Sequence, residues 1–232
     1  MGVPANTRVL VYLNGSDPRL EGLYLMGAEV GDTLGRIGVS LVGAPSFSMF
    51  LVRPRSDQIY NLRRMFTVLG ELEERDLPVF PTVFATGEAD IACWVRWLAE
   101  RPRVWLVGTV IQRQEARYFD DQIMQLVWMQ RALRDRELPL HVILYGVGAP
   151  KRVQRARELG LRCFVCITSE AAMTAGMGRR LIRANDRLIA RRDPEGTREA
   201  LLAANLRVQT EAFAEFPLDP GGLVQPATID YA

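Results

Sequence analysis

The sequence predicts a parallel α/β fold: a (β/α) barrel or a partial TIM-like barrel, with additional C-terminal helices. Three observations predict it. Short apolar runs rich in Val, Ile and Leu alternate with longer stretches of helical periodicity. These runs stay apolar at successive positions, as strands buried on both faces do. They recur at about 25 to 35 residues, the spacing that strand–helix–strand units require.

Six strands and four helices are expected in the first 167 residues. The expected strands span 9–13, 37–42, 79–84, 104–110, 140–145 and 163–167. The expected helices span 57–75, 88–100, 120–136 and 151–159. A closed barrel has eight strands, so a shortened barrel, a barrel completed by the C-terminal tail and an open doubly wound sheet remain alternatives.

The pattern changes after the sixth expected strand. Residues 173–178 are expected to form a loop containing Gly and Met, followed by a basic helix over 179–192. After a break at 193–196, a further helix is expected from Thr197 to about Phe213. The tail from Pro217 has no periodicity. We therefore expect one (β/α) domain over 1–216 and an extended tail over 217–232.

The bulk composition fits one globular α/β domain. The chain has 232 residues, of which 48% are hydrophobic and 24% charged, and its net charge of +2 is too small to demand a nucleic-acid or membrane partner. The first apolar run is too short for a secretory signal, and no run is long enough to span a membrane. Three cysteines are typical of a reducing compartment. The expected location is the cytoplasm.

Polar residues follow the expected strands and should gather at one edge of the sheet. In parallel α/β folds, ligand sites form in the loops at the carboxyl ends of the strands. The polar character of these loops also has a purely structural explanation, since loop backbone needs hydrogen bonds. The candidate ligand-binding residues are Ser46, Ser48, Thr82, Gln112, Gly146, Gly148 and Lys151.

The strongest local signal is the turn at 144–150, Leu-Tyr-Gly-Val-Gly-Ala-Pro. Glycines allow close approach of the backbone to a ligand, and the helix that begins at Pro150 offers free N–H groups to an anion, with Lys151 beside them. A tight strand–helix connection explains the same residues without a ligand.

No metal site or cofactor is expected. His141 is the only histidine and falls at the start of an expected strand, on the wrong face for the site. Cys163 and Cys166 have C-x-x-C spacing, but on a strand their side chains point to opposite faces. Four zinc ligands therefore do not converge.

The stretch from Tyr145 through Gly146, Gly148 and Pro150, then Leu159-Gly160-Leu161 and Phe164-Val165-Cys166-Ile167, resembles the tRNA-guanine transglycosylases and their relatives that insert deazaguanines into DNA. This resemblance implies a (β/α)₈ barrel that acts on nucleobases. Val165 stands where the family has its nucleophilic aspartate, and the zinc cysteines of the family have no counterpart. Asp90 or Glu170 would have to supply a carboxylate.

A second resemblance covers about residues 36 to 165. Pro45-Ser46-Phe47-Ser48-Met49-Phe50, Arg53-Pro54-Arg55 and Tyr60-Asn61-Leu62-Arg63-Arg64 are similar to an uncharacterised phage- and plasmid-borne bacterial family. It implies a phage or mobile-element context and no particular activity.

Three functions follow as hypotheses, one of which is a small-molecule lyase or isomerase on the same scaffold. The first is a nucleobase-, nucleoside- or nucleic-acid-related protein on a transglycosylase-like barrel, with the question of enzymatic activity open. The alternative is a catalytically inactive barrel that binds nucleic acid or a protein partner. The alternative rests on an expected basic helix face, which a solvated surface stripe also explains. The candidate nucleic-acid-binding residues on that face are Arg180, Arg183, Arg187 and Arg191.

Overall fold

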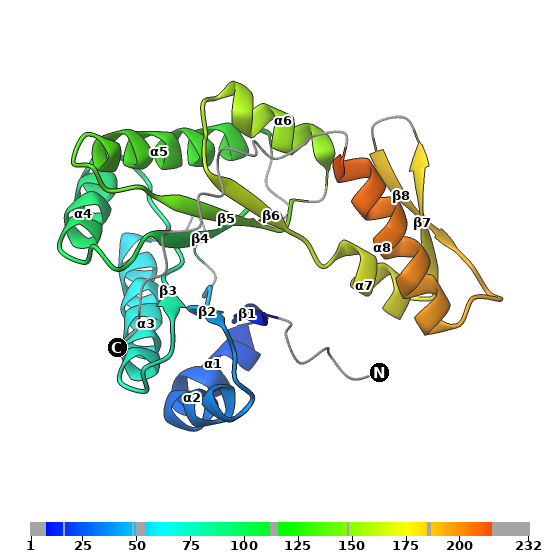
Figure 1. The fold of residues 1–232 in the computed structure, drawn as a ribbon, viewed down its shortest axis with the longest axis horizontal. Helices are drawn as coiled ribbons and strands as arrows, with labels where there is room; N and C mark the ends of the chain where they lie inside the picture. The colour runs from blue at the N-terminus through cyan, green and yellow to red at the C-terminus, as the bar shows by residue number, and fades with distance from the viewer. Residues whose placement is uncertain are drawn as a thin grey trace.

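The fold consists of two parallel sheets and the helices that surround them (Figure 1). The computed structural model describes residues 8–15, 17–47, 49, 54–111, 116–147, 149–184 and 187–214. The strands are β1 Leu10–Tyr12, β2 Leu41–Gly43, β3 Val79–Phe80, β4 Leu106–Val110, β5 His141–Tyr145, β6 Phe164–Ile167, β7 Arg179–Ala184 and β8 Arg187–Arg192. The helices are α1 Asp17–Leu25, α2 Gly27–Arg36, α3 Arg55–Glu73, α4 Glu88–Ala99, α5 Ala116–Arg134, α6 Pro150–Glu158, α7 Glu170–Gly176 and α8 Arg198–Ala214.

The first six strands are parallel and neighbour one another in chain order. One sheet has the order β1-β2-β3 and the other the order β4-β5-β6. A parallel bridge between Thr82 and Gly108 joins the two sheets. The parallel α/β prediction is thus confirmed. A doubly wound sheet reverses its strand order at a switch point, which this order does not do.

Both faces of the central strands are covered. In β4, Val107 is fully buried among apolar side chains from α4 and α5, whereas Leu106 packs with Phe80 and Ile143 on the opposite face. In Figure 1, α2 to α6 lie outside the sheets. The apolar runs that predicted β4 and β5 are the consequence of this two-sided burial.

Three helices end in the same way before their strands. Asp76, Glu137 and Gly160 each have a positive φ, at 54°, 61° and 99°. The next residue is a leucine in each case, and its N–H donates to the carbonyl five residues earlier, as Leu77 does to Leu72 at 3.3 Å. This is the Schellman arrangement, which pairs carbonyls that the helix end leaves open.

Helices α1 and α2 occupy a region where no helix was expected, and the expected strand 37–42 begins only at Leu41. Glycines obscure the helical pattern because glycine is a poor helix former. In α2, however, Gly27 and Gly31 have a packing role. A Cβ on Gly27 would clash with the Glu71 carboxylate, and one on Gly31 would lie 2.5 Å from Cδ of Arg75. The two glycines let α2 approach α3 closely.

The last four elements form a unit of their own. α7, β7, β8 and α8 pack chiefly on one another, at the side of the molecule away from α3 and α4 (Figure 1). Two expectations are corrected here. The expected loop over 173–178 begins within α7, and the expected basic helix over 179–192 is an antiparallel β-hairpin. The helix expected from Thr197 is confirmed as α8.

Asn205 of α8 ties this C-terminal unit together. Its side chain is fully buried, and its Oδ1 accepts the Leu181 N–H at 2.6 Å. Its Nδ2 donates to the carbonyls of Ala171 at 3.3 Å and Arg179 at 3.0 Å. One amide side chain therefore links α7, β7 and α8, and it satisfies three backbone groups that would otherwise be buried unpaired.

None of the helices in the described part of the chain is long and apolar enough to cross a membrane. The expected tail from Pro217 lies outside the described residues.

Candidate functional site

A chain of hydroxyl hydrogen bonds links the carboxyl ends of the first three strands. The Tyr12 hydroxyl lies 2.9 Å from Thr82 Oγ1, and Thr82 Oγ1 donates to the Ala44 carbonyl at 3.0 Å. Since Thr82 gives its only hydroxyl proton to Ala44, the Tyr12 hydroxyl is the donor to Thr82. Burial raises the pKa of Tyr12 well above its ordinary value, so this donor keeps its proton. Thr82 is thus a buried structural residue.

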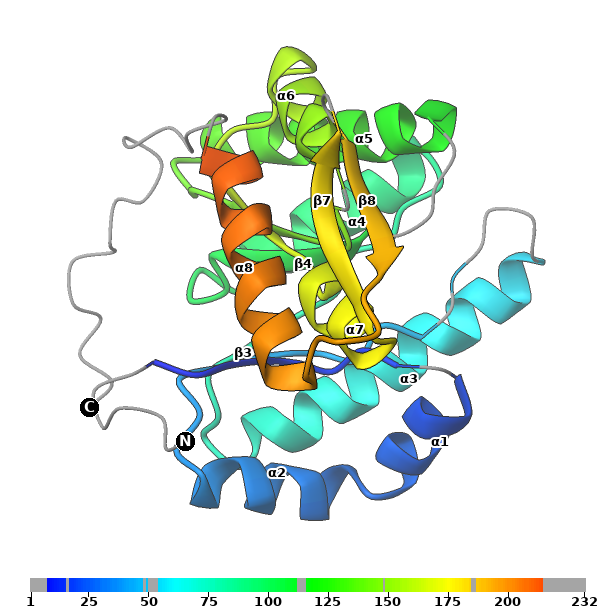
Figure 2. The same cartoon turned by 90° about the vertical axis from the view of Figure 1, so that its right-hand side faces the viewer.

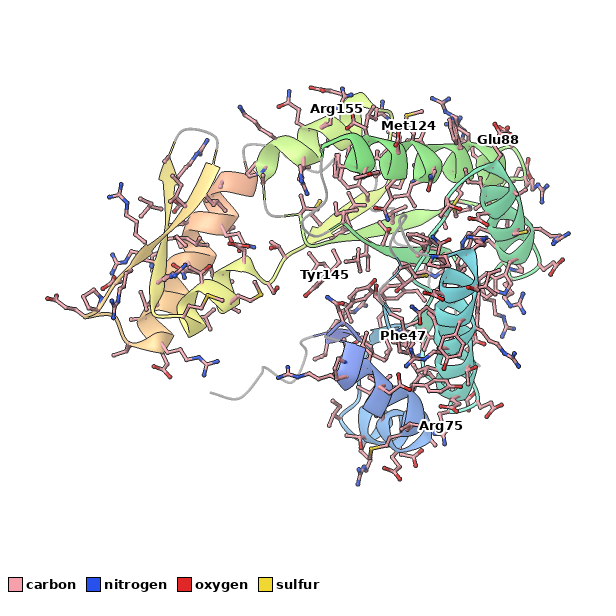
Figure 3. The ribbon with its side chains drawn as sticks, turned by 180° about the vertical axis from the view of Figure 1, so that it is seen from behind. Phe47, Arg75, Glu88, Met124, Tyr145 and Arg155 are labelled. Atoms are coloured by element: carbon pink, nitrogen blue, oxygen red, sulfur yellow. The ribbon has the colours of Figure 1, made fainter. Side chains whose placement is uncertain are left out.

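The Tyr12 ring fills the inner face of the sheet. Tyr12 and Phe80 stack at 5.8 Å, and both rings lie over Gly43 and Gly108, where a Cβ would clash with them. Tyr145, at the end of β5, lies 5.1 Å from the Tyr12 ring, centroid to centroid. Side chains of β1 and β5 therefore meet across the sheets, which requires the six strands to curve. Figure 3 shows Tyr145 on the side of β5 away from α5 and α6.

Tyr145 is the half-buried member of this aromatic group. Its hydroxyl lies 3.5 Å from Ser169 Oγ, just before α7. Gly146 follows with φ 84°, a left-handed conformation, and its N–H donates to the Ile167 carbonyl at 2.8 Å. Gly146 therefore turns the chain and holds β5 to the end of β6. Of the expected ligand turn, the helix start at Pro150 is confirmed, and ligand binding at the turn stays a prediction.

The other expected ligand residues are placed as follows. Ser46 is half-buried, and its N–H donates to the Leu13 carbonyl at 3.1 Å. Lys151 is exposed in the first turn of α6. Ser48, Gln112 and Gly148 lie outside the described residues. A common ligand site of these residues stays a prediction.

Asp90, in the first turn of α4, binds residues outside that helix. It accepts the Thr86 N–H and the Thr86 hydroxyl, each at 2.8 Å, and pairs with Arg55. Burial raises its pKa, but the hydrogen bonds from Thr86 and the Arg55 guanidinium outweigh burial and lower it overall. An ionised carboxylate held by Thr86 and Arg55 at the start of α4 is a structural feature and does not select Asp90 as a replacement nucleophile.

At the position that matches the transglycosylase nucleophile, this chain has Val165, and its neighbour in the sheet is apolar as well. Val165 of β6 pairs with Ile143 of β5, whose side chain belongs to the inner cluster with Phe80 and Leu106. Val165 can neither attack a carbon atom nor hold a charge. Within the described residues, His, Cys, Asp and Glu side chains also form no group of three that could hold a metal ion.

Residues of the second resemblance meet around the buried Arg64 side chain. The Arg64 guanidinium lies 4.0 Å from the Phe47 ring centroid and 5.4 Å from that of Tyr60, and it pairs with Glu21. Cation–π contacts and an ion pair account for the burial of this arginine. These residues fasten α3 to α1 and to the loop after β2, which is a structural role.

The β7–β8 hairpin concentrates arginine. Its register places Arg179 opposite Arg192 and Arg180 opposite Arg191. Leu181 is buried beside Asn205, and because strand side chains alternate, the neighbours of Leu181 point away from α8. This open face carries the Arg180–Arg191 pair and the Ile182–Ile189 pair. Figure 2, seen from the hairpin side, shows β7 and β8 in front of α7.

The expected arginine stripe is corrected by this register. On a helix, Arg180, Arg183, Arg187 and Arg191 would share one face, but on the strands Arg180 and Arg183 fall on opposite faces. Arg183 shares the face of Leu181. The side chain of Arg187 lies outside the described residues. Arg180 and Arg191 remain together, and Arg179 and Arg192 join them at the same end of the hairpin.

One carboxylate reaches this end of the hairpin in the described structure. Asp193 Oδ2 lies 2.8 Å from Arg180 Nη2, and the Asp193 Oδ1 accepts the Gly196 N–H at 3.1 Å. The Arg180 side chain is 53% exposed and that of Asp193 is 19% exposed. Asp193 is therefore held by its own loop and orients Arg180 at the surface.

No family model and no curated protein matches the chain. Similar solved structures include an enolase-superfamily protein from Listeria innocua (12% identity, TM-score 0.34, 66% of this chain and 33% of that one). A probable mandelate racemase from Alicyclobacillus acidocaldarius is 16% identical (TM-score 0.37, 89% and 40%). A thiamine phosphate pyrophosphorylase from Pyrococcus furiosus is 12% identical (TM-score 0.26, 89% and 96%). The chain spans well under half the length of the first two, and similarities of this size assign no function.

Sequence reasoning missed the hairpin although a signal was present. Arg-Arg-Leu-Ile-Arg-Ala and Arg-Leu-Ile-Ala-Arg-Arg flank Asn185-Asp186. Two similar runs around two turn-forming residues are typical of a hairpin with a two-residue loop. Tyr12 and Tyr145 were not among the expected site residues either, because the sequence does not show that β1 and β5 face each other.

Proposed function

We propose that this chain is a nucleic-acid-binding protein whose contact surface is the arginine-rich end of the β7–β8 hairpin. The observation that supports it is two successive cross-strand Arg–Arg pairs at one end of the hairpin, Arg180–Arg191 on the open face and Arg179–Arg192 on the face of Leu181. Like charges directly opposite each other destabilise a sheet, so such pairs favour an anionic partner that relieves the repulsion. Phosphates bind guanidinium groups through paired hydrogen bonds, which suits closely spaced arginines.

In this proposal, the scaffold is a partial (β/α) barrel whose strands do not close into a ring. Six parallel strands in chain order, curved enough for Tyr12 and Tyr145 to touch, support it. The apolar Val165 favours a binding role over transglycosylase chemistry. The three cysteines are unpaired, which favours a reducing compartment such as the cytoplasm. The similarity to a phage- and plasmid-borne family favours a mobile-element context for such binding.

Salt dependence tests the proposal. The chain is expected to bind a fluorescein-labelled oligonucleotide at 50 mM salt and to lose affinity steeply by 200 mM, as measured by fluorescence anisotropy. Arg180→Ala and Arg191→Ala should each reduce the slope of log K against log [salt] by about 0.7 to 0.9, the contribution of one phosphate contact.

Arg36→Ala is the matched control. Arg36 is exposed on α2 and hydrogen-bonds Thr33 at 3.1 Å, and its loss should leave the slope unchanged. Absence of binding at 50 mM salt, or equal slopes for all four proteins, would contradict the proposal.

A second candidate function is nucleoside binding at the carboxyl end of β5, which the exposed part of Tyr145 and the neighbouring Ser169 hydroxyl favour. Gly146→Val is expected to lower the thermal midpoint, because valine at φ 84° is strained by about 1–2 kcal/mol. If the turn positions a ligand, calorimetry should show saturable nucleoside binding by the unmodified protein. The Gly146→Val protein should show no binding at a temperature well below its own thermal midpoint. Absence of nucleoside binding by the unmodified protein contradicts this candidate, and a lowered midpoint alone shows a structural turn.

A further inference from the structure

Resting on the proposed function, we infer that the nucleic acid is double-stranded B-form DNA and that the β7–β8 hairpin enters its major groove. The hairpin is a two-stranded ribbon of six residues per strand. Within the described residues its ladder has no third strand. The helix α8 backs one face through Leu181 and Asn205, which leaves the other face open.

The dimensions of the ribbon match the major groove. Two strands lie about 4.8 Å apart, and six residues extend about 20 Å. The major groove of B-DNA is about 12 Å wide and admits a two-stranded β-ribbon, whereas the minor groove is about half as wide. α8 on the rear face would keep the ribbon flat and rigid as it enters.

The open face has an apolar centre with an arginine pair next to it. Ile182 and Ile189 lie directly opposite each other, and Ile189 is 42% exposed. Arg180 and Arg191 form the next pair on the same face, two residues from the isoleucines along each strand. Apolar side chains contact the C5 methyl group of thymine on the groove floor, and arginine contacts guanine edges or the flanking phosphates. An isoleucine pair with Ile189 exposed and Ile182 half-buried has no comparable use on a surface that contacts phosphates alone.

Single-stranded nucleic acid fits this face less well. Proteins that bind single strands stack the bases on aromatic side chains. The described hairpin side chains are arginine, leucine, isoleucine and alanine, with no aromatic ring among them. A-form RNA duplexes have a deep, narrow major groove that a ribbon cannot enter. Charge alone would allow all three partners, but the isoleucine pair selects B-DNA.

The test compares four 24-base probes of the same sequence by anisotropy at one salt concentration: duplex DNA, single-stranded DNA, duplex RNA, and duplex DNA carrying glucosylated hydroxymethylcytosine. The glucose fills the major groove and leaves the phosphates in place. We expect the plain DNA duplex to bind at least about tenfold more tightly than each other probe, the loss typical of one or two base contacts.

The outcomes separate this inference from the proposed function. Equal, salt-dependent binding of all four probes would overturn the major-groove inference and keep nucleic-acid binding. Preference for single strands or for RNA would overturn it in the same way. No binding of any probe at 50 mM salt would overturn both.

Substitution of the isoleucine pair gives a second readout. Ile182→Ala combined with Ile189→Ala should reduce affinity for plain duplex DNA by about tenfold while leaving the salt slope unchanged, since no phosphate contact is removed. Ile59→Ala, at an exposed position on α3, is the matched control and should change neither. Circular dichroism and hydrogen exchange of β7 check that the hairpin is still formed. Unchanged duplex affinity of a folded double variant would overturn the inference.

Discussion

Val107→Asp is expected to abolish folding at 25 °C. Val107 is fully buried in the middle of β4, and its side chain contacts the apolar cluster that α4 and α5 form on the sheet. An aspartate there would have to be buried as an unpaired charge or be protonated, at a cost of several kcal/mol. The stability of a domain of this kind is about 5–15 kcal/mol. Circular dichroism should show loss of the cooperative thermal transition, together with low solubility.

Ile59→Asp is the control for this change. Ile59 is 53% exposed on α3, so the new carboxylate stays hydrated and the midpoint should shift by no more than a few degrees. A Val107→Asp protein that is soluble and melts cooperatively would contradict the two-sided burial of β4 and, with it, the parallel-sheet reading of the sequence.

Burial explains which elements could be predicted from the sequence. β4, β5 and β6 are apolar on both faces, so their runs stand out, and α3 to α6 fall within a few residues of the expected bounds. Prolines 78 and 139 mark the strand starts that follow two of the Schellman turns. α2 was missed because two of its three buried positions, Gly27 and Gly31, are glycines that serve a tertiary contact with α3 and do not extend an apolar pattern.

The candidate site was predicted less well for a different reason. The polar residues that follow the strands show at which edge of the sheet a site is expected. They do not show the direction in which each side chain points. Thr82 turns inward to Tyr12 and Ala44, and Asp90 binds Thr86. The arginines at 179–192 suggested a helix because their spacing fits a period near 3.6 as well as it fits two strands. Which arginines are neighbours depends on the pairing register of the two strands, and the sequence alone does not give that register.

The largest expected effect on the hairpin comes from Asn205→Leu. Leucine is close in size to asparagine but would leave the Leu181 N–H and the carbonyls of Ala171 and Arg179 without their partner in a buried environment. An unpaired buried backbone group costs about 1–3 kcal/mol, so the C-terminal unit should lose several kcal/mol. Hydrogen exchange should then show β7 and α8 unprotected.

The same variant tests whether the hairpin platform is separable from the sheets and is needed for binding. Because α7, β7, β8 and α8 pack chiefly on one another, exchange protection of β4 and β5 is expected to persist in Asn205→Leu. Duplex DNA affinity should fall to the level of the Arg180→Ala, Arg191→Ala double variant or below it, because Arg179 and Arg180 are the first two residues of β7, the strand that Asn205 fixes. Arg207→Leu, at an exposed position of α8, is the matched control and should preserve both protection and binding. Loss of exchange protection throughout the molecule in Asn205→Leu would show instead that the C-terminal unit and the sheets fold as one body. Unchanged exchange protection in β7 of Asn205→Leu would show that the Asn205 amide is not what holds the hairpin in place.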